Sequence, residues 1–289
     1  MSTEVSAPSP DRPRPSATVP PPGGAAATPP EVSLIVPAYN SSAYIAANVT
    51  RIVEAFRELG VSGEVIVVDD GSTDGTVAAL TDLPGVRVVQ LEANSGKGAA
   101  LRAGMRVARG QVRGFTDADL PYGTEPLAFA LHCIRDRRFH AAIGDRTLPG
   151  SVYTGAGRVR TVVSELASFA FRTLVTGGIY DTQCGFKMFR GDVADALFAV
   201  SRIDRFAVDV ELIYLLMKYR LDIKRVPVRL EGNESTTVHV LRDSSRAFSD
   251  IVRMRLHWAL GHYRSPALVA CLENDLRADG RANAAPGAV

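Results

Sequence analysis

The sequence predicts an α/β fold, a mostly parallel and doubly wound sheet flanked by helices, and three observations favour it. Four short apolar runs rich in β-branched residues alternate with helix-like stretches between residues 32 and 116, a pattern typical of a parallel sheet with helices on both faces. Each run ends in polar or turn-forming residues, at the edge where such sheets bind ligands. The hydrophobic content of 46% in 289 residues is enough for a sizeable core.

Local signals predict the individual elements. Runs of Val, Ile and Leu indicate strands, and capping residues followed by apolar periodicity indicate helices. The expected strands are 32–37, 64–69, 86–91, 111–116, 141–146 and 221–230, the last at a sheet edge because Pro227 cannot donate to the ladder. The expected helices are 43–59 with Ser41 or Ser42 as cap, one beginning near Thr76 with Thr73 or Asp74 as cap, 99–108, 160–175, one opening at 206–211, and 249–263.

Composition divides the chain into one folded domain, residues 31–263, between two tails. Residues 1–30 are rich in Pro, Ala, Ser and Thr and lack the basic start and apolar run of a signal peptide, so we expect a disordered tail. Residues 264–289 lose hydrophobic periodicity and are expected to form a second disordered tail. No apolar run reaches the roughly 18 residues of a membrane span, so none is expected.

Net charge and cysteine content limit the classes of binding partner and the cellular compartment that we expect. A formal net charge of +2 gives no case for nucleic-acid binding. The three cysteines, Cys133, Cys184 and Cys271, are spaced too widely for a zinc site or a disulfide framework. A reducing cytoplasm is the simplest compartment for such a chain.

The stretch from Gly114 to Leu120 carries two carboxylates, Asp117 and Asp119, at the end of an apolar approach. In an extended segment residues i and i+2 point the same way, so both side chains can aim at one point beyond the strand. Hard oxygen ligands suit Mg²⁺ or Mn²⁺, which in turn can hold a diphosphate. The alternative is a solvated Asp-x-Asp turn without a metal.

Other polar side chains fall at the ends of neighbouring strands. Tyr39 follows the first strand, Asp69 and Asp70 follow the second, and Lys97 lies in a glycine-rich loop at 94–98. Asp70 would accept a hydrogen bond from a nucleobase N–H, and Tyr39 would stack on the base. Lys97 would meet a phosphate, helped by the backbone N–H groups of the loop. An Asx turn at the two Asp residues and simple packing of Tyr39 are the alternatives.

Taken together in this order, these motifs resemble the family-2 inverting glycosyltransferases of the GT-A fold, which is Rossmann-like. The stretches that carry the resemblance are VPAYN at 36–40, VVDDGSTDGT at 67–76, NSGKG at 94–98 and DAD at 117–119. The stretch DTQCGFK at 181–187 resembles the dolichyl-phosphate glucosyltransferase and mannosyltransferase branch, more closely the glucosyl kind. The resemblance covers about residues 32–230, and its acceptor end is altered at 231–239.

The resemblance implies a nucleotide-sugar donor, UDP-glucose or GDP-mannose, and a polyprenyl phosphate as acceptor. It also implies a Mg²⁺ or Mn²⁺ ion on Asp117 and Asp119, the catalytic pair, which neutralises the leaving nucleoside diphosphate during an inverting transfer. The donor site would comprise Pro37, Ala38, Tyr39, Asp69, Asp70, Lys97, Asp117, Ala118 and Asp119.

Residues of the second half are expected at the acceptor end. Forked Arg side chains hold phosphate well, although a solvated surface is the alternative for each of them. The expected acceptor-binding residues are Arg146, Arg158, Arg160 and Gln183. Asp209 and Glu211 open a helix, where the helix dipole favours negative charge, and the alternative is that one of them faces the donor sugar. A phosphate acceptor is already ionised, so no strong base is required.

Two rival functions stay open from the sequence. One is the same chemistry on a soluble acceptor in cell-wall or secondary-metabolite synthesis, favoured by the missing span and by the altered residues 235–239. The other is a non-catalytic nucleotide-sugar-binding module, against which the intact Asp pair argues.

The basic amphipathic stretch 249–263, with Trp258, suggests contact with an anionic membrane surface. The protein would then be cytoplasmic and peripheral on the inner face of the membrane. The alternative is a helix packed on the domain with its Arg residues in water.

Overall fold

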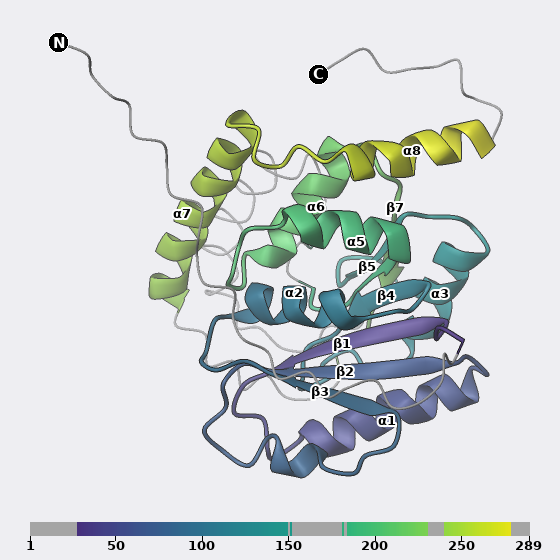
Figure 1. The fold of residues 1–289 in the computed structure, drawn as a ribbon, viewed down its shortest axis with the longest axis vertical. Coiled ribbons are helices and arrows are strands. Elements are labelled where there is room, and N and C mark those ends of the chain that lie inside the picture. Colours follow the sequence, from purple (N-terminus) through teal and green to yellow (C-terminus); the bar gives the residue numbers. More distant parts are fainter. Residues whose placement is uncertain (1–27, 150, 152–180, 182–183, 231–239, 279–289) are drawn as a thin grey trace.

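The computed structural model describes residues 28–149, 151, 181, 184–230 and 240–278 (Figure 1). The expected helix at 160–175, most of the N-terminal tail and the altered stretch 231–239 lie outside the described residues. So do three of the expected acceptor-binding residues, Arg158, Arg160 and Gln183.

One seven-stranded sheet organises the described chain, with the order β3-β2-β1-β4-β6-β5-β7. Neighbouring strands run parallel except that β6 is antiparallel to both β4 and β5. The predicted mostly parallel sheet is therefore confirmed, and β7 lies at an edge as Pro227 requires. The strands are β1 (Val32–Ala38), β2 (Gly63–Asp69), β3 (Val86–Gln90), β4 (Val112–Phe115), β5 (Ala141–Asp145), β6 (Lys187–Arg190) and β7 (Ile223–Pro227).

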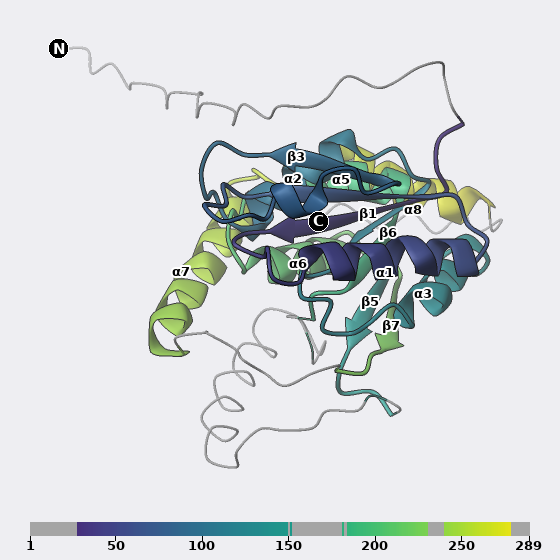
Figure 2. The same cartoon turned by 90° about the horizontal axis from the view of Figure 1, so that it is seen from below.

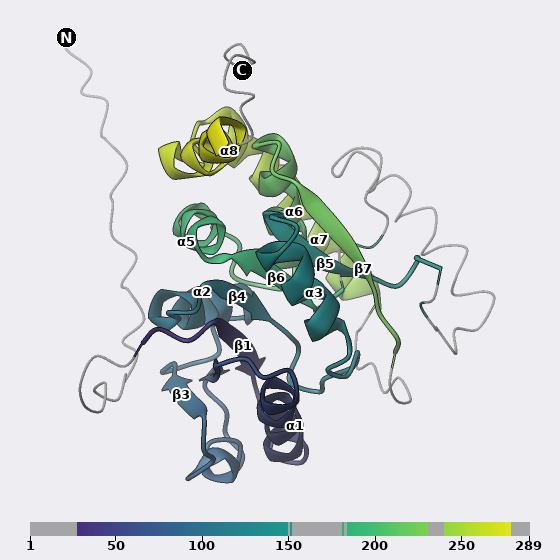
Figure 3. The same ribbon diagram turned by 90° about the vertical axis from the view of Figure 1, so that its right-hand side faces the viewer.

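Helices cover both faces of this sheet, as Figure 3 shows with α1 and α3 on one face and α2 and α5 on the other. The helices are α1 (Ile45–Glu58), α2 (Lys97–Val107), α3 (Pro126–Arg135), α5 (Gly191–Val200), α6 (Val208–Lys218), α7 (Val240–Ala259) and α8 (Pro266–Ala278), with a short 3₁₀ helix η1 (Ala78–Leu80). The sequence analysis did not identify α3, α5 or β6.

The central strand β1 shows why the strands read as continuous apolar runs. Leu34 and Val36 point into the core beneath α1 and α3, whereas Ile35 points into the core beneath α2, α5 and α6. All three are at most 1% exposed. Because both faces are covered, both sets of alternating residues are largely apolar, and the buried Ser33 is satisfied by donating to Glu64 at 2.6 Å.

Two local expectations in the first half are wrong. The α-helix expected to begin near Thr76 is replaced by the single 3₁₀ turn η1. Asp82 adopts a positive φ of 63° and Pro84 comes two residues later, so a longer helix cannot form. No side chain caps α1, where the backbone carbonyl of Ser41 accepts from Ile45 N at 3.0 Å instead.

The expectation of a disordered tail from residue 264 is also wrong, since residues 266–278 form α8, which packs against α5. Leu268 and Cys271 are buried in the core, and Asp275 accepts hydrogen bonds from Arg190 at 2.7 and 2.9 Å. The signal was missed because the apolar residues of this helix form one continuous run, PALVACL at 266–272, without helical spacing. The folded domain therefore extends beyond residue 263.

None of the described helices combines the length and apolar character needed to cross a membrane.

Burial of α8 predicts that its core-facing residue contributes to stability. Leu268→Ala should lower the free energy of unfolding by about 2–5 kcal/mol, because the buried side chain leaves a cavity. Val269→Ala, next to it but 44% exposed, is the matched control and should change stability by less than about 0.5 kcal/mol. Urea unfolding measures both, and equal effects would mean that α8 does not dock as described.

Candidate active site

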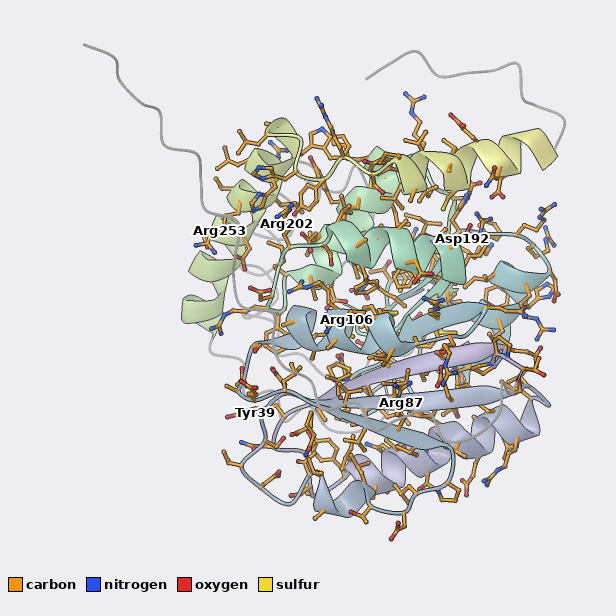
Figure 4. All side chains as sticks on the ribbon, in the orientation of Figure 1. Tyr39, Arg87, Arg106, Asp192, Arg202 and Arg253 are labelled. Atoms are coloured by element: carbon orange, nitrogen blue, oxygen red, sulfur yellow. The ribbon has the colours of Figure 1, made fainter. Side chains whose placement is uncertain are left out.

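The parallel strands β1, β2 and β4 bring the predicted motifs to one edge of the sheet. Ala38 pairs with Asp69 and Ile35 pairs with Phe115. The residues that follow strands β1, β2 and β4 therefore leave the sheet side by side. Ala38 is buried, whereas Tyr39 is 46% exposed and projects at this edge in Figure 4. An exposed aromatic ring at a ligand-binding edge fits the predicted role on a base better than simple packing does.

Asp70 organises the glycine-rich loop. Its carboxylate accepts hydrogen bonds from Ser95 N at 2.7 Å and Gly96 N at 2.8 Å. Burial raises the pKa of Asp70, while these two backbone donors oppose the rise. Asp69 accepts a hydrogen bond from Ser72 N, three residues further on, and not from the residue two positions on as in the Asx turn considered for this pair. Each Asp70 oxygen has lone-pair capacity for a second donor, so the predicted contact with a nucleobase stays compatible with this geometry.

The loop amides, in contrast, are already used by the protein. Gly98 N and Ala99 N donate to the carbonyl of Asp204 at 2.7 and 3.2 Å, and Ser95 N and Gly96 N donate to Asp70. The amides of Ser95, Gly96 and Gly98 therefore already have protein acceptors, and the expectation that loop amides help to bind a phosphate stays a prediction. The close approach of the 203–204 backbone also requires glycine at position 98, because a Cβ there would lie 2.0 Å from the carbonyl oxygen of Ile203.

Lys97 has a different position from the one expected. Its ammonium lies 2.7 Å from Asp117 Oδ1 and 2.9 Å from Asp209 Oδ2, and only 7% of its side chain is exposed. Burial alone would lower the pKa of Lys97, but the two carboxylates raise it above its ordinary value. Lys97 is thus a permanently charged group that holds Asp117, rather than a side chain that faces the solvent.

Asp117 and Asp119 lie on the turn after β4, at the mouth of the site. The turn is held by Asn48, whose side-chain amide donates to the carbonyl of Ala118 at 3.0 Å, and by Leu120 N, which donates to the carbonyl of Asp117 at 3.0 Å. A third of the Asp117 side chain is exposed, and Asp119 is exposed. Partial burial, and then repulsion from Asp117, raise the pKa of Asp119.

This pair fits a hard divalent cation. Two neighbouring carboxylates whose repulsion a cation would relieve are the donor set that Mg²⁺ and Mn²⁺ use together with substrate phosphates. Within the described ranges, no group of three or more His, Cys, Asp or Glu side chains is placed to hold a metal. The remaining ligands would therefore come from substrate and water.

Residues 184–187 lie beside this site. A Cβ at Gly185 would lie 1.7 Å from Asp117 Oδ2, so the glycine leaves the room that the carboxylate occupies. Two residues later the ammonium of Lys187 donates to the carbonyl of Cys184 at 2.7 Å and to Asp209. The bridging positions of Asp209 and Lys187 were missed by sequence reasoning, because their partners are far away in the chain.

Neither acid of α6 faces an open site. Asp209 is held between two lysines, and Glu211 accepts from Arg202 N at 2.8 Å, from Ile203 N at 3.1 Å and from the Tyr263 hydroxyl. Both are buried. The alternative in which one of them contacts the donor sugar is therefore not supported by the structure.

Comparison with known proteins places this geometry in a family. The family model for glycosyl transferase family 2 matches residues 33–198. The chain belongs to glycosyl transferase family 2. It is therefore an enzyme, a glycosyltransferase, and not a non-catalytic binding module.

Curated relatives lie in the branch that the sequence motifs resembled. The dolichyl-phosphate beta-glucosyltransferase of Dictyostelium discoideum is 30% identical over 251 residues, covering 81% of this chain and 76% of the relative. The enzyme of the same name from Drosophila melanogaster is 35% identical, with 71% and 69% coverage, and that from Homo sapiens is 29% identical, with 81% and 78% coverage.

Solved structures confirm the predicted GT-A fold. Glucosyl-3-phosphoglycerate synthase from Mycobacterium tuberculosis in complex with UDP aligns with a TM-score of 0.59 at 19% identity, covering 78% of this chain and 80% of that one. The same enzyme with Mn²⁺, UDP and glucosyl-3-phosphoglycerate aligns with a TM-score of 0.56 at 21% identity, with the same coverage.

In this family 2 glycosyltransferase, Arg146 is paired with an acid of the stretch 181–187. Its Nε and Nη2 donate to the two oxygens of Asp181 at 2.8 and 2.9 Å, and its backbone N donates at 2.9 Å. Burial alone would raise the pKa of Asp181, but Arg146 lowers it. The predicted contact of Arg146 with an acceptor phosphate would have to use the rest of the guanidinium, Nη1 in particular.

The close approach of Gly185 to Asp117 predicts a selective loss of activity. Gly185→Ala should lower kcat at least about 10²-fold, because the new methyl displaces a carboxylate that Lys97 fixes. Gly75→Ala, whose new Cβ meets nothing nearer than 3.8 Å, is the control. Steady-state transfer assays and circular dichroism of both variants test this, and a fully active Gly185→Ala enzyme would contradict the described packing.

Proposed function

We propose that this glycosyltransferase transfers glucose from UDP-glucose to a polyprenyl phosphate, with inversion at the anomeric carbon. The relatives that carry the name dolichyl-phosphate beta-glucosyltransferase, at 28–35% identity, support this substrate pair. Solved structures of the same fold hold UDP-glucose with Mn²⁺. Mannose from GDP-mannose is the second candidate for the sugar.

The observation that carries the proposal is the arrangement of acids at the strand ends. Asp117 and Asp119 open to the mouth of the site, whereas Asp209 and Glu211 are buried and already bound to protein donors. This arrangement suits an acceptor that needs no base, because a phosphate oxygen is already ionised at neutral pH. That oxygen attacks the anomeric carbon, and the bond from this carbon to the nucleoside diphosphate breaks.

The residues of the donor site have separate proposed roles. We infer that Asp117 and Asp119 hold Mg²⁺ or Mn²⁺, which when bound supplies electrostatic stabilisation of the leaving diphosphate. Asp70, with Pro37, Ala38, Tyr39 and Asp69 around it, would receive the nucleoside. Lys97 keeps Asp117 in place from behind. Arg146 is the described residue proposed for the acceptor phosphate.

A soluble acceptor is the second candidate, and one comparison favours it. Glucosyl-3-phosphoglycerate synthase has been solved with phosphoglyceric acid, a soluble phosphorylated acceptor, on the same fold. Both acceptors carry an ionised phosphate, so recognition of that anion does not separate them. Attack by the hydroxyl of phosphoglyceric acid would need a base, whereas attack by a polyprenyl phosphate oxygen would not.

A transfer assay tests the metal and both acceptors together. Purified enzyme would receive Mn²⁺ or Mg²⁺, radiolabelled UDP- or GDP-sugars, and either polyprenyl phosphate in detergent or 3-phosphoglycerate. We expect label from UDP-glucose in the organic phase. Asp119→Ala should reduce it by about 10²–10³-fold through loss of electrostatic stabilisation.

Asp136→Asn, an exposed acid next to His132 on the far side of α3 from this chemistry, is the control. Label that moves only to the soluble acid would establish the second acceptor. Full transfer by Asp119→Ala with the metal chelated would refute the proposed role of the Asp pair.

We further propose that α7 binds a membrane surface and holds the enzyme peripherally on the cytoplasmic face. Three aliphatic residues spaced four apart, Val252 and Leu256 on this helix and Leu260 directly after its end, are 44%, 54% and 67% exposed. Arg253 and Arg255 flank them and are exposed. An apolar stripe bordered by Arg suits the interface of an anionic bilayer. Figures 1 and 2 show α7 on the side of the molecule towards which β1 points.

Trp258, expected to contact the membrane, packs on the protein instead. Its ring meets Tyr214 and Tyr219 edge to face, with centroids 6.0 and 5.9 Å apart. The aliphatic stripe, rather than the indole, is therefore the part of α7 proposed for lipid contact.

Vesicle sedimentation tests this surface. Leu256→Glu with Leu260→Glu should reduce binding to vesicles containing anionic lipid at least about tenfold, because each Leu loses roughly 1.5–3 kcal/mol of burial. Val269→Glu, at an aliphatic residue on α8 that is 44% exposed, should leave binding unchanged. Retained binding by the double variant would show that another surface contacts the membrane.

A further inference from the structure

Four side chains of alternating charge lie in a row behind the mouth of the site. Asp117 Oδ1 is 2.7 Å from Lys97 Nζ, which is 2.9 Å from Asp209 Oδ2, and Asp209 Oδ1 accepts from Lys187 Nζ. Exposure of the side chains falls along the row from 33% at Asp117 through 7% and 5% to none at Lys187. We call these four residues the charge relay.

The relay ties together three elements that are distant in the sequence. Lys97 begins α2, Lys187 begins β6 and Asp209 lies in the first turn of α6. Both ammonium groups lie 5.4 Å from the centroid of Phe115, the last residue of β4. Phe115 precedes Asp117 by two residues, so the relay braces the strand end from which the exposed carboxylate projects.

Stability alone is a weak explanation for this arrangement. Burying four charges requires desolvating all of them, and well-packed apolar residues of similar volume often stabilise a core as well or better. The relay, however, ends at the exposed group of the site. Its inner members fix the position of Lys97, because an ammonium on a flexible stem that contacted Asp117 alone would move with that carboxylate.

We propose that Asp209 and Lys187 are positioning residues that set the orientation of the Asp117 carboxylate through Lys97. Lys187, anchored on the carbonyl of Cys184 at 2.7 Å, holds Asp209. Asp209 holds Lys97, and Lys97 pulls one oxygen of Asp117 inwards, while the absent side chain of Gly185 leaves space for the other oxygen. The inference rests on the proposed function, in which Asp117 and Asp119 bind a divalent cation with a nucleoside diphosphate.

The decisive variant removes both inner charges at once. Asp209→Asn alone leaves Lys187 buried without its acid, so loss of folding would confuse the result. The double variant Asp209→Leu with Lys187→Met replaces the pair by apolar side chains of similar size, which keeps the core filled. It leaves Lys97 and Asp117 in the chain but removes the support on the inner side of Lys97.

Calorimetric titration with UDP, in Mn²⁺ and again in EDTA, measures positioning without turnover. We expect the double variant to unfold at nearly the wild-type temperature and to lose at least about tenfold in Mn²⁺-dependent UDP affinity. Its UDP affinity in EDTA should not change, because the base side of the site is untouched. In transfer assays kcat should fall by a similar factor or more.

Glu211→Gln is the matched control, since Glu211 lies two residues along the same helix and is also buried, but contacts the 202–203 backbone and Tyr263. It should lower thermal stability and leave Mn²⁺-dependent UDP affinity unchanged in the folded protein. Wild-type affinity and kcat in the double variant would overturn the positioning role. A wild-type enzyme whose UDP affinity is the same in Mn²⁺ and EDTA would instead overturn the metal-diphosphate site, and the relay's role with it.

Discussion

The ion pairs of one buried ammonium, Lys97, constrain the whole site. A charged group with little exposure needs opposite charge close by, and here Asp117 and Asp209 supply it from two sides. This requirement brings α6 against the start of α2, and Asp209 of α6 pairs in turn with Lys187 at the start of β6. The orientation of the exposed carboxylate thus depends on an ion pair between two residues that lie 112 positions apart in the chain.

A second constraint is that the backbone N–H groups at the start of α2 and in the glycine-rich loop donate to acceptors within the protein. The first amides of α2 are satisfied by Asp204 and the glycine loop by Asp70. A helix N-terminus often binds phosphate, but this one is capped from within. The site therefore presents carboxylates at its mouth, and a divalent cation is the group that makes such a surface attractive to a diphosphate.

The sequence predicted what local patterns encode and missed what tertiary contacts decide. Alternating apolar runs and the polar residues at their ends identified the sheet and the Asp117–Asp119 turn. The partners of Lys97 were unpredictable because Asp209 lies in another helix, with no spacing rule between them. Helix α8 was missed because its apolar residues form one continuous run at 266–272 without helical spacing. The helix expected after Thr76 was wrong because Asp82 and Pro84 end the turn early.

The most direct test of the account is a crystal structure with UDP and Mn²⁺, with anomalous scattering recorded at the manganese edge. We expect an anomalous peak in contact with Asp117 and Asp119, and Lys97 still paired with both Asp117 and Asp209. A manganese ion bound elsewhere, or Lys97 released from both acids to contact the diphosphate, would contradict the central role given to this buried ion pair.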